Sequence, residues 1–83
     1  MHELGVLRYA VGTVERFARE NNIWRVKHIT LEVGEDSGYV PLYLQKLFPV
    51  AIDSSSVLKD AQLRIQLASG KGLVIKDIGC ETN

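Results

Sequence analysis

The sequence predicts one α/β domain of the α+β kind, in which two helices pack on one face of a three-stranded mixed sheet. Apolar residues recur every three to four positions in two segments, as in helices, and at alternate positions in three segments, as in strands. The five segments follow the order α-β-α-β-β. A length of 83 residues suits a single domain, 1–83, and no linker or repeat divides it.

The first helix is expected from Glu3 to Arg19. Its apolar residues alternate steps of three and four, which places them on one side of a helix: Leu4, Leu7, Val11, Val14 and Ala18. Glu3 near the start and Arg19 near the end suit the helix dipole. Asn21 and Asn22 tolerate the left-handed conformation that often ends a helix.

The middle of the chain predicts a strand followed by a second helix. Over residues 26–33, apolar residues alternate with polar ones, so one face of this strand is expected to meet water. The cluster 34–38 is typical of a turn. The second helix has Pro41 in its first turn, where a missing N–H costs least. Pro49 is expected to end or kink this helix, because it cannot donate to the Gln45 carbonyl.

Two further strands complete the expected sheet. Alternation over Leu63–Leu67 predicts one, and Leu73 begins the other. Ile78 falls out of phase with Leu73, and a bulge near Lys76–Asp77 would return it to the inner face. The connection 68–72 contains two glycines and suits a hairpin, so the last two strands are expected to pair antiparallel. The first two strands, joined by a helix, are expected to be parallel.

The composition excludes several classes of function. Ten basic and ten acidic residues cancel, so no long-range field attracts nucleic acid. No apolar run approaches the roughly 20 residues that cross a bilayer, and the opening residues do not resemble a signal peptide. Cys80 is the only cysteine, which rules out an intramolecular disulfide and a multi-cysteine zinc site within one chain. A cytoplasmic protein without membrane or nucleic-acid partners is therefore expected.

The opening triplet, Met1-His2-Glu3, carries the most specific chemistry. The α-amine of Met1, the backbone nitrogen of His2 and the His2 imidazole can close adjoining chelate rings around one metal ion. Planar nitrogen donors of this kind suit nickel(II) or copper(II). The fourth ligand is open: the Glu3 region, another side chain, water or a partner. The alternative is a solvated helix start, in which Glu3 interacts with the helix dipole.

His28 has two interpretations. It falls on the polar phase of the first strand and has no neighbouring ligand at a useful spacing, which favours a solvated strand histidine. The alternative is that folding brings it toward His2 as a supplementary ligand.

Together these features resemble the HypA/HybF family of hydrogenase and urease nickel incorporation proteins along almost the whole chain. The opening Met1-His2-Glu3-Leu4 is similar to the family's N-terminus, where the terminus and the second-position histidine hold nickel. The other similar segments follow in the family's order: Arg25-Val26, Ile29-Thr30-Leu31-Glu32-Val33-Gly34-Glu35, Ser37-Gly38-Tyr39-Val40-Pro41, Leu44, Phe48, Ala61, Leu63, Ile65 and Gly72-Leu73-Val74-Ile75-Lys76-Asp77-Ile78. The resemblance implies a nickel(II) site formed by Met1, His2 and Glu3.

The chain departs from the family between its last two strands. Family members insert a zinc-binding module with paired C-x-x-C motifs at that place, whereas this sequence has only residues 68–72. The resemblance therefore implies a nickel-binding domain without structural zinc. Cys80 lies beyond the last matching strand and is expected to be an exposed tail thiol. Pro49 also departs from the family pattern, at the end of the second helix.

The leading functional hypothesis is a nickel metallochaperone-like domain for the maturation of hydrogenase or urease. By resemblance, its partners would be a HypB-type GTPase and a nickel-enzyme precursor. The alternative is a metal-independent protein-interaction module that retains the HypA fold. An enzyme is not expected, because Ser54-Ser55-Ser56 has no evident base partner and Gly70-Lys71-Gly72 lacks the motif of a phosphate-binding loop. A monomer or a weak homodimer is expected, since an exposed sheet edge can pair two chains.

Overall fold

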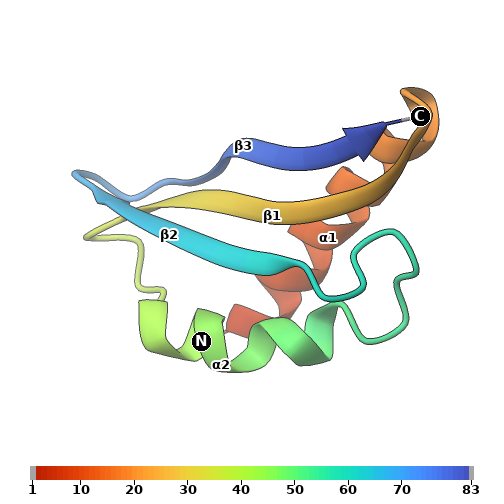
Figure 1. Cartoon of the computed structure of the whole chain (residues 1–83). Helices are drawn as coiled ribbons and strands as arrows, with labels where there is room; N and C mark the ends of the chain where they lie inside the picture. Colours follow the sequence, from red (N-terminus) through yellow and green to blue (C-terminus); the bar gives the residue numbers. More distant parts are fainter. Residues whose placement is uncertain (1, 83) are drawn as a thin grey trace.

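The protein folds as two helices packed on one face of a three-stranded sheet, as Figure 1 shows for the computed structural model, which describes residues 2–82. The elements follow the chain in the predicted order: α1 (Glu3–Glu20), β1 (Ile23–Gly34), α2 (Pro41–Ala51), β2 (Gln62–Ala68) and β3 (Leu73–Thr82). The predicted fold class, α+β with one mixed sheet, is confirmed. Among the described helices, neither is both long and apolar enough to span a bilayer.

β1 is the central strand of the sheet, whose order is β2-β1-β3. It pairs in parallel with β2 and antiparallel with β3, so the expected parallel pairing of the first two strands is confirmed. The expected hairpin between the last two strands is wrong, because β2 and β3 lie on opposite sides of β1. The reason lies in β1 itself: Ile29, Leu31 and Val33 are at most 1% exposed. A neighbour on each edge removes this apolar strand and its backbone groups from water.

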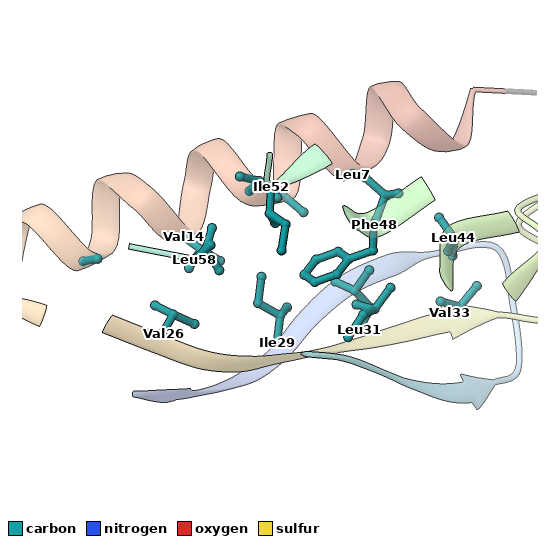
Figure 2. Close-up of a cluster of buried hydrophobic side chains, with 14 of the residues drawn as sticks. Leu7, Val14, Val26, Ile29, Leu31, Val33, Leu44, Phe48, Ile52 and Leu58 are labelled. Atoms are coloured by element: carbon teal, nitrogen blue, oxygen red, sulfur yellow. The ribbon is translucent and has the colours of Figure 1, made fainter. Parts of the chain in front are cut away.

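The core lies between β1 and the two helices. Figure 2 shows side chains of α1, α2 and β1 directed toward one another, joined by Leu58 from the segment before β2. Burying a side chain of this kind contributes about 1.5–3 kcal/mol, so this layer holds both helices against the sheet. The labelled residues are at most 9% exposed: Leu7, Val14, Val26, Ile29, Leu31, Val33, Leu44, Phe48, Ile52 and Leu58. The stripe predicted for α1 is buried, apart from the half-buried Leu4.

β1 begins at Ile23, three residues before the predicted start, because irregular pairing with β3 changes its phase. Trp24 and Lys27 have no partner on β3. Each extra residue shifts the alternation by one, so the buried Ile23, Val26 and Ile29 are spaced by three positions instead of two. A rule based on strict alternation therefore misses the first part of this strand.

The bulge predicted near Lys76 on β3 is confirmed. Residues 30–31 of β1 pair with Asp77 and Ile75, so Lys76 between them has no partner. The extra residue returns Ile78 to the core side, where it packs against the buried cluster.

α2 has Pro41 in its first turn as predicted, but it continues past Pro49 to Ala51. Of the two outcomes predicted for Pro49, an end of the helix is therefore wrong, and a kink stays a prediction. The N–H of Ile52 donates to the Phe48 carbonyl at 3.1 Å. Phe48 and Ile52 are both buried, one on each side of the proline. Their packing against the core holds the last turn in helical geometry despite the donor that the proline removes.

The connection between β2 and β3 crosses the end of β1 and is bound to it by the backbone. The N–H of Gly34 donates to the Gly72 carbonyl at 2.7 Å, and the N–H of Asp36 donates to the Gly70 carbonyl at 2.8 Å. A Cβ at position 34 would overlap the backbone of Gly70 and Gly72. The close approach of the two backbones therefore requires a glycine at position 34.

Gly34→Ala is expected to lower the free energy of unfolding by about 1–3 kcal/mol, the usual cost of forcing extra atoms into a packed contact. Gly12→Ala, inside α1 with open space around the added Cβ, is the matched control and should raise that free energy by about 0.5–1 kcal/mol. Urea unfolding measures both. Equal stabilisation by the two variants would show that the connection moves away from β1 at no cost.

Candidate metal centre

His2 is the N-cap residue of α1 and presents its side chain to solvent. Its carbonyl accepts a helical hydrogen bond from the N–H of Val6 at 3.0 Å, while its side chain makes no capping hydrogen bond. The imidazole therefore extends from a backbone position that the helix fixes. Met1, the predicted source of the α-amine, lies outside the described residues.

The carboxylate of Glu3 is buried and joins the starts of the two helices. Only 4% of Glu3 is exposed, and its Oε2 accepts a hydrogen bond at 3.0 Å from the N–H of Val40, the N-cap of α2. Burying a carboxylate is costly unless it is hydrogen-bonded, and negative charge is favoured near the N-terminus of either helix. Glu3 is therefore not the solvated residue of the alternative interpretation, because its carboxylate is held in a long-range contact.

Sequence reasoning missed the contact between Glu3 and Val40 because the two residues are 37 positions apart. One local signal was available. Glu3 lies four residues before Leu7, which is 1% exposed, and residues at this spacing share one face of a helix. The position of Glu3 on the buried face of α1 follows from this spacing, whereas its hydrogen-bond partner does not.

Side chains alone do not form a metal site within residues 2–82: no three His, Cys, Asp or Glu residues of this range lie close enough to hold an ion. Cys80 is exposed as predicted, but it lies within β3, opposite Val26, instead of in a tail.

His28 lies on the sheet face that points away from the helices. The next residue, Ile29, faces the core, and alternate residues of a strand point to opposite faces. The Nε2 atom of His28 is 3.4 Å from Nη1 of Arg64 on β2 and 3.6 Å from Oδ1 of Asp77 on β3. Because the sheet separates it from the layer that carries His2, the structure does not bring the two imidazoles together. With its side chain 21% exposed, His28 is a partly buried sheet residue.

Comparison with known proteins gives one consistent result. A family model described as "Hydrogenase/urease nickel incorporation, metallochaperone, hypA" matches residues 1–78. The chain is 29% identical over 76 residues to the hydrogenase maturation factor HypA of Campylobacter jejuni, and the alignment covers 92% of this chain and 67% of that protein.

Two solved structures have the same fold. The solution structure of the Ni metallochaperone HypA from Helicobacter pylori superposes with a TM-score of 0.82 at 17% identity and covers 100% of both chains. A second solution structure of a HypA protein superposes with a TM-score of 0.67 at 21% identity, covering 93% of this chain and 71% of the other. At these identities the likeness establishes the fold alone.

Glu3→Ala is expected to lower the free energy of unfolding by about 1–3 kcal/mol, because the N–H of Val40 loses a charged acceptor in a buried place. Glu20→Ala, at the exposed last residue of α1, is the matched control and should change the free energy of unfolding by at most about 0.5 kcal/mol. Urea unfolding compares the two. Equal effects would argue that the carboxylate of Glu3 does not hold the helix starts together.

Proposed function

This chain belongs to the HypA family of hydrogenase and urease nickel incorporation metallochaperones, and on that premise we propose that it carries a nickel(II) ion at its own N-terminus. The ligands are the α-amine of Met1 and the backbone nitrogen and imidazole of His2, with the Glu3 backbone adjoining. The observation that carries the proposal is the exposed side chain of His2 at the fixed first turn of α1.

The start of a helix suits a site that uses backbone nitrogens. The first four N–H groups of an α-helix have no acceptor within the helix, so the nitrogens of His2 and Glu3 can lose their protons without breaking a helical hydrogen bond. The carbonyl of His2 already bonds to Val6, which keeps the chain helical from the next residue onward. A metal can therefore bind at this end of α1 while the helix remains intact.

Charge at the helix start is the main objection, because the positive end of a helix disfavours a cation. Deprotonated backbone nitrogens reduce this unfavourable interaction, since each removes one unit of positive charge from the metal complex. The buried carboxylate of Glu3 adds a negative charge at the same end of the helix. Because this carboxylate is bonded to Val40, it acts in the proposal as a positioning group and the metal-facing atom of Glu3 is its backbone nitrogen.

Delivery requires that the ion leave as well as bind. The exposed position of His2 allows a recipient protein to approach the metal, and a ligand from that protein can then replace one of the four nitrogen donors of this chain. We infer that the recipients are those that the family implies: a HypB-type GTPase and the precursor of a nickel enzyme.

The proposal includes neither a structural zinc nor a catalytic activity. Residues 69–72 join β2 to β3 directly and their backbone is bonded to Gly34 and Asp36. Cys80 is the only cysteine, whereas structural zinc sites combine several cysteine or histidine ligands. The nickel-handling part of the family's function is therefore assigned to this domain without a zinc module.

Untagged protein with its native N-terminus is expected to bind one nickel ion in a calorimetric titration. His2→Ala should weaken binding about tenfold or more, because one ligand and one chelate ring are lost. A Gly-Ser extension before Met1 should do the same, because it removes the terminal amine from its place. Affinity should rise with pH, since the nitrogen ligands bind in their deprotonated forms.

His28→Ala is the matched control, since it removes an imidazole from the far face of the sheet, and it should leave the nickel affinity unchanged. Unchanged affinity in His2→Ala would contradict the proposal. In that case, binding of a partner protein that resists both His2→Ala and chelators would favour the metal-independent interaction module.

A further inference from the structure

The outer face of the sheet, which the helices leave open, contains a depression of about 260 Å³. β1 contributes three residues to its lining, β2 contributes two, and one lies in the segment before β2. The lining consists of Arg25, Lys27, His28, Asp60, Gln62 and Arg64. The depression is separated by the sheet from the N-terminal site at His2.

Positive charge is concentrated in this depression, although the whole chain has a formal net charge of zero. Asp60 is the only carboxylate in a lining that holds two arginines and a lysine. Arg25 lies 3.8 Å from Glu81, and both side chains are 43% exposed, so this pair is weak. Within the described part of the chain, Lys27 and Arg64 form no ion pair with a carboxylate. Two permanent cations are therefore available to a ligand.

The guanidinium of Arg64 lies beside the ring of His28. Its Nη1 lies 3.4 Å from Nε2 of His28, and this Nε2 also lies 3.6 Å from Oδ1 of Asp77, so the imidazole stands between the guanidinium and a carboxylate. The ring of His28 is itself confined, because a side chain at position 79 would overlap it and only a glycine leaves it room. Among residues 2–82, the other N–H groups of this exposed side chain have no hydrogen-bond partner, and a guanidinium of this kind binds an oxyanion through two parallel hydrogen bonds.

We propose that this depression binds a phosphate group, with the guanidinium of Arg64 and the ammonium of Lys27 as its cationic contacts and the side-chain amide of Gln62 as a neutral donor. A small multivalent anion fits better than an acidic peptide. Carboxylates lie at several points around the cations: Asp60 in the lining, Asp77 beside His28 and Glu81 beside Arg25. They would repel an extended acidic segment, whereas one phosphate group can contact the cations alone.

Titration of ¹⁵N-labelled, metal-free protein with inorganic phosphate tests the proposal at pH 7.5, with chloride at equal ionic strength as the reference. The amide signals of Lys27, His28 and Arg64 should shift and saturate with phosphate and not with chloride. Arg64→Gln and Lys27→Gln should each weaken binding about tenfold, the usual effect of losing one charge-assisted contact. Lys46→Gln, the same change of charge on the exposed face of α2, should leave the affinity unchanged.

A parallel titration with a nucleoside diphosphate distinguishes two sources of the phosphate group. Both of the following results support the site. If the nucleoside diphosphate binds these residues more tightly than inorganic phosphate does, the site is assigned to phosphate esters. If it binds more weakly, the site is assigned to free phosphate. Shifts that do not saturate, or that are equal in chloride, would overturn the proposal. So would saturation by hexaglutamate without saturation by phosphate, since that result indicates an acidic protein partner.

Discussion

The hydrogen bond from the Val40 N–H to the buried carboxylate of Glu3 ties the first turn of α1 to the first turn of α2. A carboxylate that is 4% exposed is costly without such a partner, so arrangements that start either helix elsewhere are disfavoured. Both helices also pack on the same apolar face of β1, through Leu7 and Phe48 among others. This hydrogen bond and the core packing together determine the position of the first turn of α1 relative to the sheet.

The proposed metal site depends on this constraint. A chain terminus is ordinarily one of the least ordered parts of a domain, and a ligand there loses conformational entropy when it binds a metal. Because Glu3 is anchored and His2 is the N-cap of α1, the backbone position of His2 is already fixed before a metal binds. The outer face of the sheet, with Arg64 and Lys27, lies on the opposite side of β1 from the helices, so the two proposed ligands do not compete for space.

Local patterns in the sequence were sufficient for the class and order of the elements, because the α1 stripe and the alternation in β1 reflect burial against one core. Strand order was not accessible, since it depends on which strand gains most from two neighbours, and nothing near residues 68–72 indicates that they cross β1. The bulge at Lys76 was detectable because Ile78 fell out of phase. The contact of Glu3 with Val40 and the meeting of cations from two strands are long-range features that sequence spacing does not reveal.

The central claim is that nickel binds in a plane of nitrogen donors at the first residues of this chain. Nickel-edge X-ray absorption on the one-to-one complex of untagged protein measures the number, type and geometry of the ligands directly. The account predicts a four-coordinate planar site with nitrogen donors, including one imidazole, and no sulfur. A six-coordinate site, or a sulfur ligand from Cys80, would contradict it.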